Sequence, residues 1–215
     1  PPRGSAGGGG AADSLGGGAG GGGPAPRAVA PRPRAGADLA AATTLPFRQA
    51  VEGSTVTFTV DGRTVTTRIP PGVRDGQKIR LRGKGRPGTA GGPDGDLVVT
   101  VHVTPHPVFS LDGNNLRITV PVTFPEAALG ATIAVPTLDG STVKVKVPAG
   151  TPSGRTLRVR GRGVKTAKST GDLLVTVQVA VPQKLSKAAR EAVETFAAET
   201  AGQDVRADLV RQAAE

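Results

Sequence analysis

The feature that most constrains the fold is an internal repeat with a period of roughly 77 residues. The segment from Asp61 to Gly85, DGRTVTTRIPPGVRDGQKIRLRGKG, aligns without a gap with Asp139 to Gly163, DGSTVKVKVPAGTPSGRTLRVRGRG. Two further pairs of segments match on either side: GDLVVTVHV with GDLLVTVQV, and LPFRQAVEGSTV with VTFPEAALGATI. The period is too long for a solenoid repeat and is typical of a small domain. The repeat therefore predicts two tandem copies of one domain.

Both copies consist of short Val- and Thr-rich runs separated by Gly, Pro and Asp, which is typical of many short β-strands. The runs expected to be strands are Thr55 to Val60, Arg63 to Ile69, Lys78 to Arg82, Asp96 to Val103, Leu116 to Val120, Thr142 to Val147, Thr156 to Arg160 and Asp172 to Val181. Asp61-Gly62 and Asp139-Gly140 each separate two such runs and predict hairpins, because Asp-Gly tolerates the positive φ of a tight turn. The predicted fold class is mainly β, with two tandem β-sandwich-like domains from an internal duplication and a short C-terminal helical segment.

The composition divides the chain into four parts. Residues 1–38 are rich in Gly, Ala and Pro and lack the apolar side chains that offset the entropy of ordering, so they predict a flexible linker. Residues 39–106 are the first β-domain and residues 107–182 the second. Residues 183–215 change to a helical pattern.

The C-terminal segment carries a small apolar stripe. Ser186 is the predicted N-cap of its first helix, and a second short helix is expected from Asp204 to about Ala213. The apolar residues on one face of the first helix are Ala189, Val193, Phe196 and Ala197. Such a stripe packs either on its own domain or on a second copy of the chain, and the pattern favours neither.

The residue types argue against catalysis and against a metal or cofactor site. The chain has no Cys and only two His, so it has no thiol nucleophile, no disulfide and no Cys-based zinc site. His102 and His106 have no Ser or second His at nucleophile or metal spacing. Gly83 to Gly88 satisfies GxGxxG, but no helix is predicted after it, so turns explain it better than a nucleotide. We expect no enzyme activity.

The net charge of +10 is compatible with nucleic acid, an acidic membrane or an acidic protein partner. Basic residues alternate with apolar ones in the runs from Arg80 to Arg86 and from Arg158 to Arg162, which is typical of a solvated strand face. With five Phe and no Trp or Tyr, the chain lacks the stacking platforms of single-strand binders. Non-specific duplex binding stays open as an alternative.

No stretch of the sequence is long and apolar enough for a membrane span, and no signal peptide opens it, so a soluble, cytoplasmic protein is expected. Position 1 is Pro rather than Met, from which we expect the chain to be part of a longer product.

Several of these segments, in this order, resemble the C-terminal region of DnaJ-type co-chaperones, the forty-kilodalton heat-shock family. They are IPPGVRDGQKIRLRGKG, GGPDGDLVVTVHVTPHPVF, the DGNNL turn, PEAALGATIAVPTLDG and VPAGTPSGRTLRVRGRGV followed by GDLLVTV. The resemblance covers about Thr44 to Phe196. It implies two β-sandwich-like domains, of which the first binds unfolded clients, and a helical segment that forms a homodimer. It also implies a role in the heat-shock stress response and a DnaK-type chaperone as partner.

Carried over by position, the resemblance assigns residues to each role. It implies a client groove formed by Leu45, Val56, Phe58, Val60 and Phe109, which an extended client enters as an added strand. The lysines with which some relatives contact the partner chaperone are not matched, since Val56 and Pro70 stand near those positions, and Arg63 and Arg68 are the candidates to replace them. The resemblance implies dimerisation through Leu185, Ala189, Val193 and Phe196.

The chain also departs from the family pattern. No Cys-rich module interrupts the first domain, so the chain resembles the zinc-free class. The J-domain, with its His-Pro-Asp triplet, is not matched, since His106-Pro107-Val108 belongs to the domain boundary. Stimulation of a partner's ATPase is therefore expected only if a J-domain precedes Pro1. The leading hypothesis is a binding module that prevents client aggregation, and the alternative is a nucleoid-associated protein.

Overall fold

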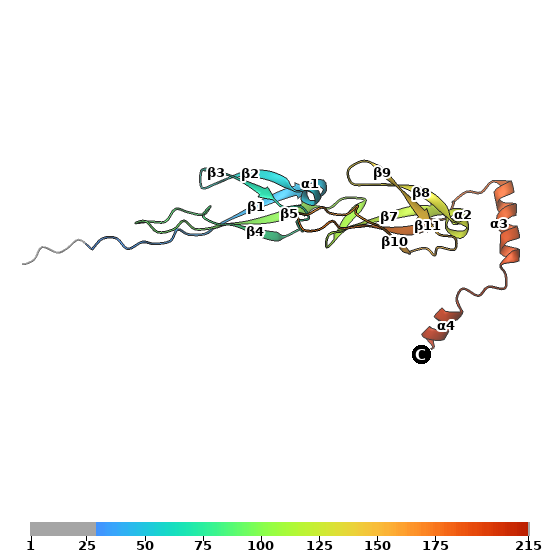
Figure 1. The fold of residues 1–215 in the computed structure, drawn as a ribbon. Helices are drawn as coiled ribbons and strands as arrows, with labels where there is room; N and C mark the ends of the chain where they lie inside the picture. The colour runs from blue at the N-terminus through green and yellow to red at the C-terminus, as the bar shows by residue number, and fades with distance from the viewer. Residues whose placement is uncertain (1–28, 215) are drawn as a thin grey trace, which may run out of the picture.

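The computed structural model describes residues 29–214, which form an elongated molecule with two β-domains end to end and two helices at the C-terminal end (Figure 1). Most of the predicted linker, residues 1–28, and Glu215 lie outside the described residues. The elements are β1 (Leu39–Pro46), α1 (Phe47–Glu52), β2 (Ser54–Val60), β3 (Arg63–Ile69), β4 (Gln77–Leu81), β5 (Leu97–Thr104), β6 (Phe109–Asp112), β7 (Asn115–Thr123), α2 (Phe124–Leu129), β8 (Ala131–Pro136), β9 (Thr142–Val147), β10 (Thr156–Val159), β11 (Leu173–Ala180), α3 (Lys187–Glu199) and α4 (Ala207–Ala213).

The first domain stacks a hairpin on a three-stranded sheet. In the sheet, β5 lies between β1, which it pairs in parallel, and β4, which it pairs antiparallel. The hairpin of β2 and β3 covers one face of this sheet, because Val65 and Ile69 of β3 share a core with the buried residues of β5. Those residues are Leu97, Val99 and Val101. Alternating side chains supply this core, as expected for strands with one buried face.

The second domain repeats the arrangement with one strand more. Its sheet has the order β10-β11-β7-β6, and the hairpin of β8 and β9 packs on it. The extra strand, β6, pairs with β7, whereas no described strand pairs with the corresponding edge of β1. Ahead of β1, Arg34 exchanges two main-chain hydrogen bonds of 3.0 Å with Thr89 of the first domain.

The mainly β fold class is confirmed, as are both Asp-Gly hairpins and the N-cap at Ser186. The Ser186 hydroxyl accepts a hydrogen bond of 3.1 Å from the main-chain N–H of Ala189 at the start of α3. The helices α1 and α2 and the strands β1, β6 and β8 were not predicted. For α2 the sequence did carry a signal, since Thr123 and Glu126 form a capping box with Pro125 inside the first turn.

The joint between the domains is built by α1. Phe47 and Val51 belong by sequence to the first repeat, yet they are buried in the core of the second domain, where they join Leu116, Val135 and other residues. The Phe47 side chain is 7% exposed. The predicted boundary between residues 106 and 107 lies in the connection from β5 to β6, but α1 reaches across it. The two domains therefore share apolar packing.

His106 belongs to the same joint. Its Nδ1 accepts hydrogen bonds from the main-chain N–H groups of Val108 and Phe109, at 3.0 and 3.1 Å. Its ring lies between those of Phe47 and Phe109, with centroid distances of 5.6 and 5.3 Å. Through these contacts His106 packs between the domains and closes the loop before β6.

Candidate functional site

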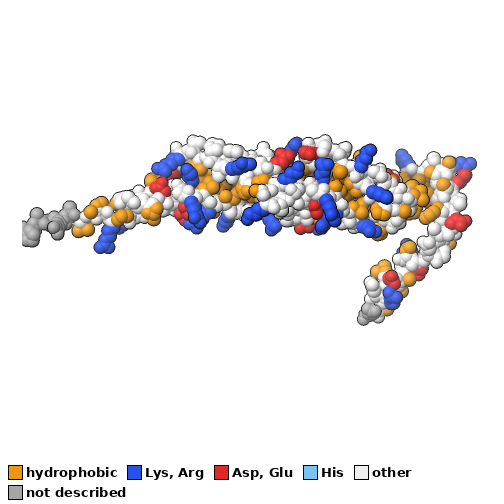
Figure 2. All heavy atoms as spheres, in the orientation of Figure 1, with side chains coloured by type: hydrophobic (Ala, Val, Ile, Leu, Met, Phe, Trp, Pro, Cys, Tyr) orange, Lys and Arg blue, Asp and Glu red, His pale blue; other side chains and the backbone are white. Residues whose placement is uncertain are grey.

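The strongest candidate site is the open side of the first domain between its hairpin and its sheet. Val56, Phe58 and Val60 alternate along β2 with exposed threonines and point toward the sheet, where they remain half-buried. Leu39, at the start of β1, is half-buried beside the same core. We call the apolar surface of Leu39, Phe58 and Val60 the first-domain groove. Figure 2 shows hydrophobic side chains at this level, between the hairpin and the larger sheet.

The turn of the hairpin fixes the position of β2. Asp61 has a φ of 49° and Gly62 a φ of 74°, so both central residues occupy the left-handed region that a two-residue hairpin turn with right-handed twist requires. The residues that flank the turn are Val60 and Arg63, which face each other in the ladder. In such a hairpin this flanking pair exchanges both main-chain hydrogen bonds.

The outer edge of β2 is open to another strand. Because hydrogen-bonded and non-hydrogen-bonded pairs alternate from the turn, Thr57 and Thr66 form a non-hydrogen-bonded pair, in which side chains approach closely. Their hydroxyl oxygens are 3.0 Å apart, as this assignment expects. The main-chain N–H and C=O groups that point away from β3 are then those of Thr55, Thr57 and Thr59. Among the described strands, none pairs with this edge.

The groove ends in a cleft with a basic rim. The cleft has a volume of about 220 Å³ and is lined by Leu39, Val60, Asp61, Arg63 and Lys84 to Pro87. Arg86 donates a hydrogen bond of 2.8 Å to the Asp61 carboxylate, whereas Lys84 takes part in no ion pair among residues 29–214. An extended ligand in the groove would meet apolar side chains along β2 and positive charge at this end.

The carboxylate of Asp96, a partly exposed residue just before β5, holds the basic loop in place. Asp96 accepts a hydrogen bond of 2.9 Å from the main-chain N–H of Gly83 and one of 2.6 Å from Nε of Arg80. These hydrogen bonds hold the pKa of Asp96 below its usual range, and the one from Gly83 has the largest effect. The second repeat has the same device, since Gly161 donates its main-chain N–H to Asp172 at 3.0 Å. The ionised Asp96 carboxylate therefore holds the loop that carries Lys84 through the main-chain N–H of Gly83.

The structure separates the residues that were predicted for the client groove. Val56, Phe58 and Val60 lie together on β2, but Leu45 is 3% exposed in the core of the first domain. Phe109 is also buried, in the core of the second domain. Leu45 and Phe109 thus present little surface to a ligand. Leu39, which sequence reasoning missed, takes the position at the groove that had been given to Leu45.

The two arginines predicted to contact a partner lie on different faces. Arg63 lines the cleft at the end of the groove. Arg68 faces Thr55 across the hairpin, and both are exposed on its outer face. Only Arg63 therefore lies at the groove.

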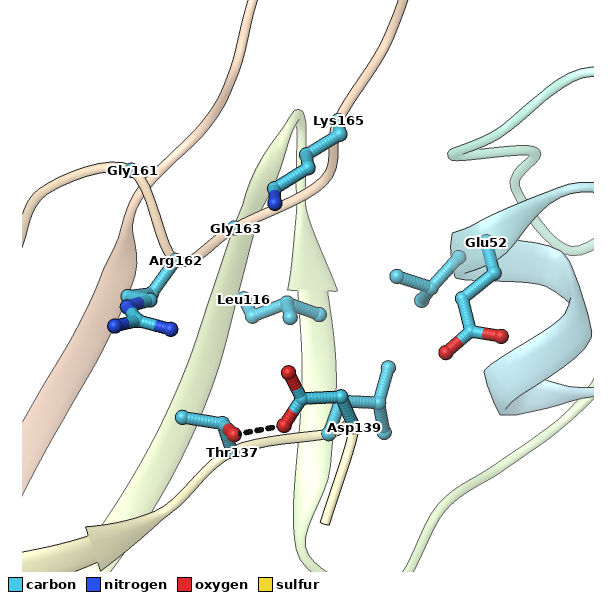
Figure 3. A pocket seen from close by; sticks show the side chains of 10 residues that line it. Glu52, Leu116, Thr137, Asp139, Gly161, Arg162, Gly163 and Lys165 are labelled. Carbon is cyan, nitrogen blue, oxygen red and sulfur yellow. Dashed lines mark hydrogen bonds between the residues drawn. The ribbon is translucent and has the colours of Figure 1, made fainter. Parts of the chain in front are cut away.

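The second domain has a corresponding cleft, of about 270 Å³, at its joint with α1 (Figure 3). It is lined by Val51, Glu52, Leu116, Thr137 to Asp139, Gly161 to Gly163 and Lys165. Glu52 enters it from α1, and Arg162 and Lys165 lie across from it on the loop after β10.

Asp139 stabilises the turn at this cleft. Its carboxylate accepts hydrogen bonds from the Ser141 hydroxyl at 2.6 Å, from the Thr137 hydroxyl, and from the Ser141 main-chain N–H at 2.9 Å. These hydrogen bonds hold the pKa of Asp139 far below its usual range, and the one from the Ser141 hydroxyl has the largest effect. The Asp139 carboxylate therefore has a structural role, because it stabilises the turn between β8 and β9.

Replacing Asp139 with Asn is expected to remove one pH-dependent contribution to stability. Because folding lowers the pKa of Asp139, its ionised form stabilises the fold above the ordinary carboxyl range near pH 4, and this contribution is lost as the pH falls through the folded value. The difference in free energy of unfolding between the wild type and Asp139→Asn should thus be largest above about pH 4 and shrink below it. Urea titrations followed by circular dichroism from pH 2 to 7 measure it; a difference independent of pH contradicts the assignment.

The residues predicted for dimerisation lie at the far end of the molecule. Leu185, Val193 and Phe196 are largely exposed and Ala189 is half-exposed. Phe196 makes an edge contact with Phe124 of α2, with ring centroids 5.2 Å apart. No residue of α3 or of α4 is buried. This end of the chain therefore presents apolar side chains without cover.

Other site types find no support among the described residues. Within residues 29–214 no three His, Asp or Glu side chains form a group that could hold a metal ion. No helix follows Gly83 to Gly88, since the next element is β5, so the GxGxxG pattern is a turn-rich loop. None of the described helices has the length and apolar content to cross a membrane. On the face seen in Figure 2, Lys and Arg are spread along both domains and do not gather in one patch.

Comparison with known proteins gives a consistent match. The family model described as "DnaJ C terminal domain" matches residues 34–182. "Chaperone protein DnaJ 1" of Streptomyces avermitilis is 58% identical over 152 residues, which cover 70% of this chain and 38% of that protein. "Chaperone protein DnaJ 2" of Mycolicibacterium paratuberculosis is 64% identical over 137 residues, 63% of this chain and 35% of that protein. The chain thus spans little more than a third of the relatives it matches.

Proposed function

Because the chain belongs to the DnaJ C-terminal domain family, a family of chaperones and not of enzymes, we propose that it binds extended apolar segments of unfolded proteins in the first-domain groove and so prevents their aggregation. The client lies along β2 as an added strand. Its main chain bonds to the free groups of Thr55, Thr57 and Thr59, which gives affinity without dependence on sequence. Its apolar side chains contact Leu39, Phe58 and Val60.

The observation that carries this proposal is the coincidence of a free strand edge with an uncovered apolar surface. The backbone edge of β2 has no partner strand among the described residues, and the side chains beside it are half-buried instead of buried. A folded domain normally covers or charges such an edge, because it is a template for pairing with other chains. Here the adjacent residues are threonines, which leave the edge open.

The test is suppression of aggregation of a denatured model client by the wild type and by Phe58→Ser. Phe58 is half-buried, so the substitution removes apolar contact with the client while leaving the buried core in place. Fully burying a Phe side chain is worth about 1.5 to 3 kcal/mol, so client affinity is expected to fall about tenfold or more. The matched control is Thr57→Ser, on the outer face of the same strand, which should protect the client like the wild type.

The dependence of binding on salt distinguishes this function from nucleic-acid binding, with which the net charge of +10 is compatible. Apolar burial is only weakly sensitive to salt, whereas binding to phosphates weakens steeply with it. Protection that persists in high salt and is lost in Phe58→Ser supports the groove. Absence of protection, together with tight DNA binding that high salt abolishes, would overturn the proposal in favour of a nucleoid-associated role.

The proposal extends to two partners. A DnaK-type chaperone receives the client, and its contact includes Arg63 at the basic end of the groove; Arg68, on the outer face, lies away from this end. A second copy of the chain forms a homodimer through the exposed apolar residues of α3. What supports the dimer is that an isolated 13-residue helix with Val193 and Phe196 exposed is marginally stable in water.

A further inference from the structure

The two repeats follow one another along the chain, and α1 of the first repeat packs on the second domain at the surface that corresponds to the first-domain groove. In the second domain, α1 lies at the open side between hairpin and sheet, with Phe47 and Val51 in the core that includes Leu116 and Val135. Val51 and Glu52 also line the cleft at the end of that groove. Phe47 and Val51 are four residues apart and so lie on one face of the helix. We call the surface of Leu116 and Val135 the second-domain groove; it therefore holds a helix that the chain itself supplies.

The first domain has the same surface without the helix. By the repeat and by strand register, Leu39 corresponds to Leu116, because the two face Leu97 and Leu173 in equivalent strand pairs. Phe58 corresponds in the same way to Val135, since they face Val65 and Val143. Leu116 and Val135 are buried, whereas Leu39 and Phe58 are half-exposed. No helix among the described residues covers the first-domain groove as α1 covers the second.

The charges at the two clefts also correspond. In the second domain, Glu52 at the C-terminal end of α1 lines the cleft with Arg162 and Lys165 (Figure 3). Lys84 of the first domain occupies the repeat position of Arg162 and lines the first-domain cleft with Arg63. The Glu52 carboxylate pairs with Arg48 of its own helix at 3.0 Å, and within residues 29–214 no ion pair joins it to Arg162 or Lys165. An acidic residue just after the apolar face of a bound helix would therefore lie in a cleft whose lining includes basic side chains in either domain.

We propose that the first-domain groove also accepts amphipathic helices from client proteins, which present Phe-x-x-x-Val followed by an acidic residue as α1 does to the second domain. The inference rests on the proposed function, since it adds a second class of client to the same groove. A helix needs no main-chain bonds to β2, so the two modes use different contacts: extended clients use the strand edge, and helical clients use side-chain packing and the charge of Lys84.

The probe is a fluorescein-labelled, side-chain-stapled helical peptide in an Ala-rich host, with Phe, Val and Glu at the spacing of Phe47, Val51 and Glu52. Saturable binding to the full chain, measured by fluorescence anisotropy, is expected. Replacing the peptide's Phe with Ser should weaken it about tenfold or more. Lys84→Glu should weaken it severalfold, and a peptide with Lys in place of Glu should recover binding to that variant. Arg162→Glu makes the same charge reversal at the corresponding position of the second domain. Because α1 already occupies that domain's groove, this variant should bind the peptide like the wild type.

A second peptide, extended and apolar with a central Pro that prevents helix formation, separates this inference from the function on which it rests. If both peptides bind and compete, and Lys84→Glu affects the helical one more, the inference holds. If only the extended peptide binds, helix recognition is refuted and the proposed function stands. If neither binds, the proposed function fails together with the inference.

Discussion

Replacing Phe47 with Ala is expected to lower the free energy of unfolding by about 3 to 5 kcal/mol, the usual cost of removing a buried Phe side chain. Phe47 is 7% exposed and packs in the core of the second domain, although it belongs to the first repeat. Its ring also contacts the ring of His106, at a centroid distance of 5.6 Å. The substitution thus removes packing that both domains share, so we expect one cooperative unfolding transition to separate into two.

The duplication supplies the matched control, Phe124→Ala. Phe124 occupies the position of Phe47 in the second repeat, but it is 46% exposed. The expected loss for Phe124→Ala is about 1 kcal/mol or less, because partly exposed side chains lose less packing on truncation. Scanning calorimetry and circular dichroism suit both variants, since the chain has no Trp or Tyr for intrinsic fluorescence. Equal destabilisation by the two variants would show that α1 does not couple the domains.

Removal of residues 183–215 is expected to halve the mass in solution while both β-domains stay folded. Between residues 183 and 214, which the structure describes, no hydrophobic residue is buried, so the cores do not depend on this segment. Its apolar side chains include Val193, 53% exposed, and Phe196, 48% exposed, and both would be covered in the proposed dimer. Sedimentation velocity measures the mass, and an unchanged value would refute dimerisation through this segment.

A point variant tests the same interface without truncation. Val193→Glu places a charge in the proposed contact, and burial of an unpaired charge is costly enough to raise the dimer dissociation constant about a hundredfold or more. Ala198→Glu is the control, because residue 198 lies on the side of α3 away from Ala189, Val193 and Phe196. Retention of the dimer by Val193→Glu would place the interface elsewhere.

The sequence by itself determined the local structure and the duplication. Alternating apolar residues and Asp-Gly turns decide strands and hairpins within a few residues of chain, because side-chain period and positive φ are local properties. The N-cap at Ser186 is equally local. The six-residue helices were beyond this reasoning, since so short a segment shows no helical period, although the capping box at Thr123 and Glu126 announces α2.

Only the tertiary structure decided which apolar side chains are open to a ligand. Leu39 and Leu45 lie on the same face of β1 by their even spacing, and nothing in the strand distinguishes them. Leu45 is buried and Leu39 is half-exposed because their neighbours come from distant parts of the chain. Phe47 and Phe124 occupy the same repeat position but differ in burial. Phe47 is buried in the core of the following domain, whereas the aromatic contact that the described residues give Phe124 is with Phe196 of α3. Strand pattern fixes which way a side chain points, but its burial depends on long-range packing, which a linear pattern does not encode.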